Sequence, residues 1–147
     1  MEVIECTASD APLLAEMNRQ LIEDEKAETD LSVAQLEERM KAFIASEYRA
    51  FFFKEDDRVV GYALCKLAAA PVYLRQFFIN RGERRRGCGR RAFHALLSRL
   101  EVSEIDIDVF TYGMKRGRLS GRRLDLKGGS WGCATKKIKA SEKYGCL

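Results

Sequence analysis

The chain has 147 residues, of which 46% are hydrophobic and 33% charged. This composition fits one globular domain with a hydrophobic core and excludes a chain that is disordered throughout. No apolar run approaches the ~20 residues that span a bilayer, and the N-terminal stretch "MEVIECTASD" lacks the basic start and apolar run of a secretory signal. We therefore expect a cytoplasmic protein without a membrane partner.

The net charge of +4 is unevenly distributed along the chain. Residues 111–147 contain ten Lys and Arg and two Asp and Glu, whereas residues 1–110 contain the remaining 16 and 20. The last quarter also contains seven of the eleven glycines. The main body is therefore mildly acidic, and residues 111–147 form an atypical basic, glycine-rich segment that we assign to the same single domain.

The cysteines and the single histidine give little support for a metal site. The five cysteines are odd in number and include no C-x-x-C pair, which a structural zinc site would favour. We expect reduced, structurally incidental thiols and no bound metal.

The first half of the chain predicts one strand, two helices and a hairpin. The β-prone stretch "EVIECTA" predicts a first strand. Two apolar stripes at helical spacing follow, and a capping box of Ser32 and Gln35 opens the second. The stretch "YRAFFFKEDDRVVGYALCKL" predicts a hairpin, with two apolar β-prone runs joined across residues 54–58.

The second half predicts a strand, a helix and a strand. Residues 72–80, "VYLRQFFIN", are rich in aromatic and β-branched residues. An amphipathic helix extends to about Leu100, and Glu104–Phe110 alternates strictly and is the last convincing strand. The two strands need a crossover and should be parallel neighbours, whereas the preceding hairpins should be antiparallel. The fold class is therefore mixed α/β, with helices on both faces of the sheet.

Residues 82–93, "GERRRGCGRRAF", place five arginines and three glycines between the predicted strand and helix. Free backbone N–H groups and the positive end of the helix dipole meet at such a junction, which suits a phosphate. Gly87 and Gly89 let an anion approach the main chain without a Cβ in the way. A general anion site, a nucleic-acid site and a structural turn remain alternatives.

The pattern Arg84-x-x-Gly87-x-Gly89 resembles the acetyl-CoA signature of the GNAT N-acetyltransferase superfamily. The predicted order of elements in residues 1–110 is also similar to the first five strands and three helices of that fold. The resemblance covers about three quarters of the chain. It implies a mixed, mostly antiparallel sheet with one parallel β-α-β unit, and an acetyl-CoA-binding core in residues 1–110.

The resemblance also implies roles for particular residues. Phe78 and Ile79, at the end of the strand, would pair by main chain with the pantetheine arm of the coenzyme. The following loop would surround the pyrophosphate, mainly through backbone N–H groups, and three of its arginines could reach the 3′-phosphate of the nucleotide. The loop residues are Arg84, Arg85, Arg86, Gly87, Cys88, Gly89 and Arg90.

A GNAT enzyme transfers acetyl from acetyl-CoA to a primary amine by direct attack, so the resemblance implies a small-molecule or peptide amine as the partner. It identifies neither the acceptor nor the catalytic base, and it leaves homodimerisation open. A catalytically impaired CoA-binding protein is one alternative. A nucleic-acid-binding module that uses the basic C-terminal segment is the other, although no aromatic interleaving favours it.

Other charged residues have a functional and a plain interpretation. His94 lies one residue off the apolar stripe of its helix, as a catalytic base or as an ordinary flanking residue. Residues 21–30, "LIEDEKAETD", contain five carboxylates that could attract an amine or form a solvated surface. Asp106 and Asp108 share one face of the last predicted strand, with the same two interpretations.

After Phe110 the chain departs from the family pattern. The expected asparagine, the helix with an aromatic pair and the Gly-Phe do not follow. A divergent or disordered tail is one explanation, and a change of reading frame is another. With a changed frame we expect no regular final strand, which would leave Glu104–Phe110 as an exposed edge. When the third base of each codon is read with the first two of the next, Tyr112–Gly113 permits Trp, Gly113–Met114 permits Asn and Met114–Lys115 requires Glu. The same frame permits Phe-Trp and Gly-Phe further on.

Overall fold

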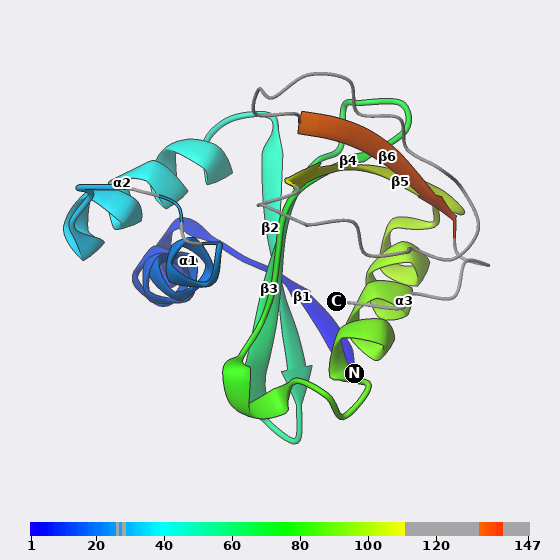
Figure 1. Cartoon of the computed structure of the whole chain (residues 1–147), viewed down its shortest axis with the longest axis horizontal. Helices are drawn as coiled ribbons and strands as arrows, with labels where there is room; N and C mark the ends of the chain where they lie inside the picture. Colours follow the sequence, from blue (N-terminus) through cyan, green and yellow to red (C-terminus); the bar gives the residue numbers. More distant parts are fainter. Residues whose placement is uncertain (26, 28, 111–132, 140–147) are drawn as a thin grey trace, which may run out of the picture.

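The structure of the chain is a computed structural model that describes residues 1–25, 27, 29–110 and 133–139. These residues form three α-helices, two short 3-10 helices and six strands (Figure 1). The strands are β1 Glu2–Glu5, β2 Tyr48–Glu55, β3 Arg58–Lys66, β4 Tyr73–Ile79, β5 Glu104–Phe110 and β6 Cys133–Lys139. The helices are η1 Ala8–Asp10, α1 Ala11–Asp24, α2 Val33–Ile44, η2 Arg81–Glu83 and α3 Cys88–Leu100.

The strands described form one sheet in the order β1-β2-β3-β4-β5-β6. Each strand is antiparallel to its neighbour except for β4 and β5, which are parallel. Helix α3 makes the crossover between these two strands, as a parallel pair requires. The predicted mixed sheet with one parallel β-α-β unit is therefore confirmed.

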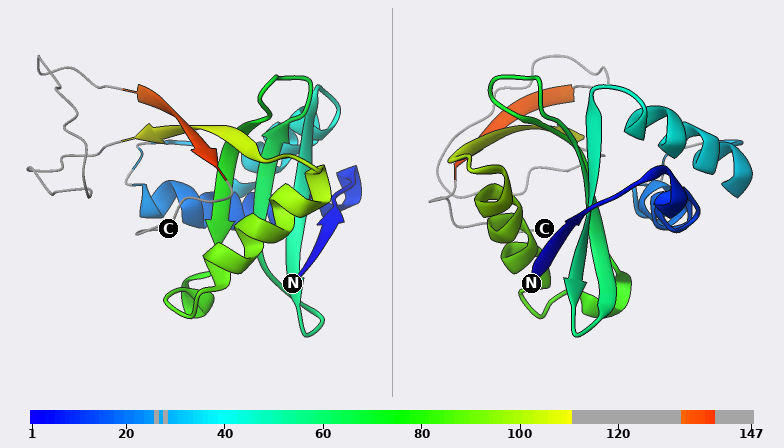
Figure 2. Two further views of the ribbon diagram at one scale, coloured as in Figure 1. Left: turned by 90° about the vertical axis from the view of Figure 1, so that its right-hand side faces the viewer. Right: turned by 180° about the vertical axis from the view of Figure 1, so that it is seen from behind.

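Helices cover both faces of the sheet, as predicted (Figure 2). Helices α1 and α2 bury Leu14 and Met40 against the same core as Tyr62 of β3. On the opposite face, α3 buries Phe93 and Leu96 in a second core. The run of phenylalanines in β2 serves both cores, because successive side chains of a strand point to opposite faces: Phe51 and Phe53 belong to the α3 core and Phe52 to the other.

Local sequence signals explain where several elements begin and turn. The capping box before α2 is present, since the Ser32 N–H donates to Gln35 Oε1 at 2.8 Å and the Gln35 N–H donates to Ser32 Oγ at 3.3 Å. The hairpin between β2 and β3 turns at Asp56 and Asp57, whose φ values are +49° and +64°. Two consecutive left-handed residues match the twist of the flanking strands. None of the described helices is both long and apolar enough to cross a membrane.

The prediction that Glu104–Phe110 would be an unpaired edge of the sheet is wrong. Strand β6 pairs antiparallel with β5 along its whole length, from Glu104 opposite Lys139 to Phe110 opposite Cys133. The physical reason is that an open strand edge presents a row of unpaired N–H and C=O groups, which a β-prone segment from elsewhere in the chain can satisfy. The rest of the C-terminal segment, residues 111–132 and 140–147, lies outside the described residues. Most of the basic residues that the nucleic-acid interpretation invokes belong to these ranges.

Candidate active site

The parallel strands β4 and β5 separate soon after they meet. Tyr73 pairs with Asp106 and Leu74 with Ile107, and β4 pairs with β5 at no later position. The register of β4 against β3 shifts at this point, because Leu64 faces Gln76 and Cys65 faces Leu74. Arg75 is thus an extra residue, a bulge that bends β4. The β5-facing side of residues 75–79 therefore has no strand partner among the described residues.

The hydrogen-bond pattern shows which main-chain groups of β4 face this gap. The Asn80 N–H donates to the Val60 carbonyl at 2.8 Å, so Asn80 points to β3. Residues alternate in direction along an antiparallel ladder, which directs the main chain of Phe78 to β3 and that of Phe77 and Ile79 to the gap. The sequence drew attention to Phe78 and Ile79 but not to Phe77, because the alternation can be fixed only when the position of the bulge is known.

The loop between β4 and α3 leads into a helix whose first N–H groups have no acceptor inside it. Arg85 and Gly87 have φ values of +63° and +72°, a conformation that glycine adopts without a Cβ penalty. The first hydrogen bond of α3 runs from the Arg91 N–H to the Gly87 carbonyl at 3.1 Å. The N–H groups of Cys88, Gly89 and Arg90 precede it and have no acceptor within the helix.

The arginines of this loop divide into two groups. Arg84 is directed inward: its Nε donates to the Ile79 carbonyl at 2.7 Å, and its guanidinium lies 5.2 Å from the centre of the Phe78 ring. Arg91 binds both carboxylate oxygens of Glu55 at 2.9 and 3.0 Å, which fixes the loop to β2. Arg85, Arg86 and Arg90 are exposed, and no described carboxylate pairs with any of the three.

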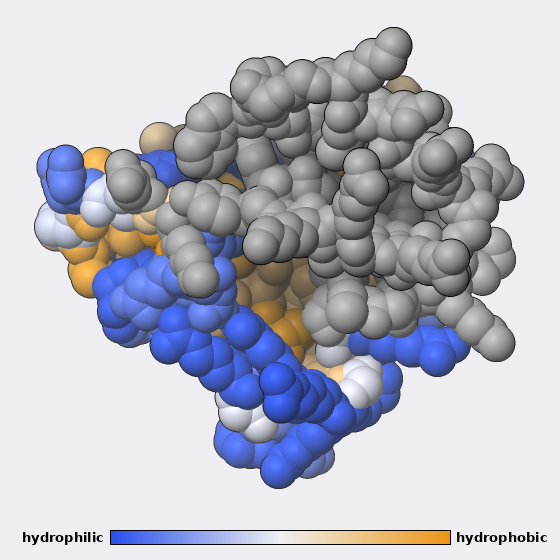
Figure 3. All heavy atoms as spheres, in the orientation of Figure 1, coloured by the Kyte–Doolittle hydropathy of each residue, from blue (hydrophilic) through white to orange (hydrophobic). Residues whose placement is uncertain are grey.

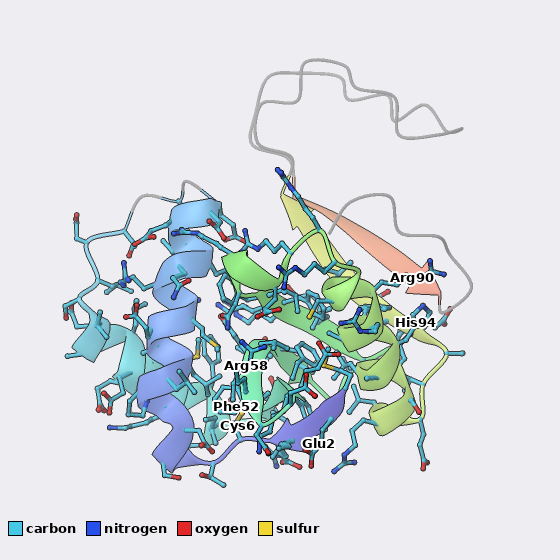
Figure 4. The ribbon with its side chains drawn as sticks, turned by 90° about the horizontal axis from the view of Figure 1, so that it is seen from below. Glu2, Cys6, Phe52, Arg58, Arg90 and His94 are labelled. Atoms are coloured by element: carbon cyan, nitrogen blue, oxygen red, sulfur yellow. The ribbon has the colours of Figure 1, made fainter. Side chains whose placement is uncertain are left out.

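Figure 4 places Arg90 and His94 on the flank of α3 that faces away from α1. They are four residues apart and so occupy one helix face, with His94 half-buried and Arg90 exposed. The edge of the molecule at the β2–β3 turn and the loop before α3 is hydrophilic (Figure 3). This is the surface from which a phosphate-bearing ligand can reach the free N–H groups.

Two of the carboxylates at the end of α1 reach the loop. Arg81 contacts Asp24 at 2.9 Å and Glu23 at 3.0 Å, and Arg84 contacts the other oxygen of Asp24 at 2.5 Å. Burial raises the pKa of Asp24, but hydrogen bonds from Arg84 and Arg81 outweigh it and hold the pKa below its ordinary value. Glu23 and Asp24 are therefore not simply a solvated surface, since they tie α1 to the candidate coenzyme loop.

A buried polar network lies on the sheet face that α1 and α2 cover. Asn18 Nδ2 donates to the Tyr62 hydroxyl at 3.2 Å, and that hydroxyl donates to Gln76 Oε1 of β4 at 3.1 Å. Asn18 and Tyr62 are fully buried, and burial raises the pKa of Tyr62. Sequence analysis missed this network, although Asn18 falls four residues after Leu14 within the apolar stripe of α1, where a polar residue is itself a signal.

Two buried oxygens on the α1 and α2 side have no hydrogen-bond partner within the described part of the chain. They are Asn18 Oδ1 and Asp106 Oδ1. Asp106 follows Ile105, which packs in the α3 core, so the alternation of β5 turns Asp106 to the opposite face. Among the carboxylates whose side chains are described, Glu25 has its pKa raised, first by burial and then by Asp24. Each of these oxygens can accept a hydrogen bond from an amine, and a carboxylate can also accept a proton.

The described part of the chain contains no candidate metal site. No group of three or more His, Cys, Asp or Glu side chains there is placed to hold an ion. The thiols of Cys6, Cys65 and Cys88 are free and buried. Burial raises the pKa of Cys88, although the residue begins α3. This thiol is therefore protonated near neutral pH and is a poor nucleophile.

Comparison with known protein families gives this site a context. Residues 13–113 match the family model of the acetyltransferase (GNAT) domain. The chain belongs to this family. The match includes β4, the loop and α3 of the candidate site, and it supports acetyl transfer as the general activity.

Solved structures of GNAT proteins share the fold. An acetyltransferase from Thermus thermophilus is 20% identical, with a TM-score of 0.62 over 76% of this chain and 77% of that one. The PaiA N-acetyltransferase of Thermoplasma acidophilum, solved in complex with coenzyme A, is 12% identical, with a TM-score of 0.59 over 74% and 79%. The spermidine N-acetyltransferase SpeG F149A mutant of Vibrio cholerae is 13% identical, with a TM-score of 0.55 over 75% and 71%. No curated protein sequence matches the chain.

Proposed function

We propose that this protein is an N-acetyltransferase that binds acetyl-CoA between β4 and β5 and transfers the acetyl group to a primary amine. The observation that carries the proposal is the opening of β4 and β5 beside a loop of free N–H groups. Family membership supports acetyl transfer in general, and a GNAT neighbour of the same fold was solved with coenzyme A.

The donor would bind mainly through the main chain. The pyrophosphate fits the loop of Arg84, Arg85, Arg86, Gly87, Cys88, Gly89 and Arg90, because its N–H groups and the α3 dipole favour negative charge. The pantetheine arm would pair with β4 at Ile79 and Phe77, whose main-chain groups face the gap, next to Phe78. Arg85, Arg86 and Arg90 are free to contact the 3′-phosphate, whereas Arg84 positions the loop through Ile79 and Asp24.

The reaction is a direct acyl transfer. The lone pair of a neutral amine forms a C–N bond to the thioester carbonyl carbon, the C–S bond breaks, and the coenzyme leaves as a thiolate. The amine must lose one proton to a base, and the thiolate must gain one. An N–H group of β4 that faces the gap would stabilise the carbonyl oxygen as its negative charge develops.

The Gly87 backbone offers a charge-specific test of donor binding. Both Asp and Asn tolerate a positive φ better than other residues, so Gly87→Asp and Gly87→Asn impose a similar backbone cost and differ mainly in charge. We expect calorimetry to give a CoA dissociation constant at least about tenfold weaker for the Asp variant than for the Asn variant, through repulsion of the phosphates. Equal binding by both variants, or no binding of CoA by the wild type, would contradict the proposal.

A further inference from the structure

The inference concerns the acceptor, and it rests on the proposed function. Arg39 of α2 and Arg75 of β4 lie over the same aromatic ring. Their guanidinium carbons are 5.6 and 5.0 Å from the centre of the Phe43 ring, and Arg75 is also 5.8 Å from that of Tyr48. The two rings themselves meet edge to face at 5.1 Å. This surface, which we call the arginine–aromatic platform, therefore consists of Arg39, Phe43, Tyr48 and Arg75.

Among the described side chains, no carboxylate pairs with either cation of the platform, although the body of the protein is acidic. The described lysines Lys41, Lys54 and Lys66 all form ion pairs. Among the arginines whose side chains are described, six form none: Arg39, Arg75, Arg85, Arg86, Arg90 and Arg99. Arg85, Arg86 and Arg90 belong to the proposed phosphate loop, and Arg99 lies near the end of α3. This leaves Arg39 and Arg75, whose guanidinium carbons both lie over the Phe43 ring.

Stacking on aromatic rings prepares these guanidinium groups to bind an anion. Arginine stacks on an aromatic face and keeps its N–H fork free for a planar carboxylate or phosphate. An anion that contacts these guanidinium groups gains charge-assisted hydrogen bonds that no described carboxylate supplies. The arrangement is therefore that of an anion-binding surface, rather than an intramolecular ion pair.

The platform lies beside the point where the reaction would occur. Arg75 is the bulge residue and directly follows Leu74, the last residue of β4 that pairs with β5. Its stacking on Phe43 places it on the α1 and α2 side of the sheet, where Gln76 accepts from Tyr62. Burial raises the pKa of that same Tyr62 hydroxyl, and the charge of Arg39 opposes this rise. The coenzyme loop lies at the other end of β4, beyond Ile79.

On the same face, Asp106 of β5 is opposite Tyr73, two residues before Arg75. Its buried Oδ1 has no hydrogen-bond partner among the described side chains, which suits an ammonium or amine group. The strand split thus combines a free cationic pair with an unpartnered carboxylate oxygen. A ligand that satisfies both has a negative group and an amine in one molecule.

We propose that the acceptor is a primary amine that also carries a carboxylate, such as an amino acid or a short peptide, and that the arginine–aromatic platform binds the carboxylate. Arg39 and Arg75 then determine specificity for the acceptor and take no part in binding the donor. The anion aligns the amine, near Asp106, with the thioester in the gap between β4 and β5.

Matched pairs of amines test this proposal. The probes are β-alanine, L-lysine and a tripeptide, each with a free carboxylate and as the corresponding amide, and both binding to the protein–CoA complex and acetylated product are measured. Charge-assisted hydrogen bonds to two arginines predict a preference of about tenfold to a hundredfold for at least one carboxylate over its amide. Arg39→Gln and Arg75→Gln should reduce this preference to near one, and Arg75→Lys should restore it only in part.

Controls separate the inference from the proposed function. Arg99→Gln removes an exposed, unpaired arginine of α3 and should leave the preference intact. All four variants should bind CoA and unfold as the wild type does. Equal binding of every carboxylate and amide, no binding of either, or a preference that survives Arg75→Gln would overturn the acceptor assignment. Failure of the wild type to bind CoA would instead overturn the proposed function.

Discussion

At the residue scale, Gly61 is required where β3 passes closest to β4. A Cβ at this position would lie 2.2 Å from the Phe78 carbonyl oxygen and 2.9 Å from the Ile79 side chain. The first contact involves main chain, which cannot rotate away. Because Phe78 and Ile79 end the strand that would hold the coenzyme, a change at Gly61 affects both stability and the site.

We predict that Gly61→Ala lowers the free energy of unfolding by about 3 kcal/mol, since overpacking displaces β4. Gly82→Ala is the matched control: no atom lies within 4 Å of its added Cβ, so its effect should stay within about 0.5 kcal/mol. Urea unfolding monitored by circular dichroism measures both variants. If the two curves coincide, β4 can move without cost and the close approach is not a constraint.

The cysteines provide a second prediction at this scale. Burial raises the pKa of Cys6 and of Cys65 to about 12, so very little thiolate is present at pH 8. Iodoacetamide should label both thiols at least about a hundredfold more slowly in the native protein than in guanidinium chloride. Peptide mapping by mass spectrometry resolves each cysteine. Rapid native labelling of Cys65 would show that its surroundings open easily.

The sequence allows a prediction of residue roles that depend on local signals, but not of roles that depend on contacts between distant parts of the chain. The left-handed backbone at Gly87 could be predicted, because glycine before a helix is a local signal. The inward path of Arg84 could not, since it depends on Asp24, which is 60 residues earlier in the chain. Arg39 and Arg75 likewise gave no signal, because a helix residue and a strand residue meet on Phe43 only in the folded protein.

At the element scale, the end of α1 is fixed to the candidate coenzyme loop by Arg81 and Arg84. The folded-state pKa of Asp24 is depressed, so its stabilising contribution is present above the unfolded pKa of about 3.9 and is lost as the pH falls through the folded pKa. We predict that Asp24→Asn lowers the free energy of unfolding by roughly 1 kcal/mol at pH 7. The difference from wild type should disappear near pH 2.

Asp57 provides the control for this measurement. It pairs with Lys54 at 3.1 Å, but its side chain is 99% exposed, so Asp57→Asn should have little effect at either pH. Urea midpoints at pH 7 and in the acid range measure all three proteins. A deficit in the Asp24 variant that persists unchanged at low pH would show that its charge is not the cause.

Elements with strong local signals agreed with prediction, and the element formed by distant pairing did not. The hairpin, the capped α2 and the β4-α3-β5 unit each follow from periodicity and turn residues within one short stretch. Strand β6 is separated from β5 by residues 111–132, and its sequence "CATKKIK" is short, with no periodicity that fixes a partner. Its position depends on the open edge of β5, which is a property of the assembled sheet.

At the scale of the whole molecule, two independent observations divide the chain at the same place. The GNAT family match ends at Gly113, and the acidic body changes to the basic, glycine-rich segment after Phe110. A frame change near Phe110 explains both, because an out-of-frame segment has no relation to the family and was not selected to pack against this core. Pairing of β6 with β5 contradicts the unpaired edge that we expected from a frame change. The frame change itself remains compatible with this pairing, since main-chain hydrogen bonds at an open edge require little of the sequence.

The coding DNA tests the hypothesis directly. We predict that the alternative frame encodes Trp-Asn-Glu at residues 112–115, then Phe-Trp at residues 119–121 and Gly-Phe at residues 124–126, with no stop codon before them. Of these, only the Glu from Met114–Lys115 is required by the genetic code. A protein with that frame restored should bind CoA as tightly as the present chain, because the loop at Gly87 is common to both. It should transfer acetyl to amines at least about tenfold faster. The family's final helix and strands would then enclose the acceptor and supply an acid that protonates the leaving thiolate. A stop codon ahead of Gly-Phe, or equal transfer rates in the two proteins, would make residues 111–147 a genuine part of this enzyme.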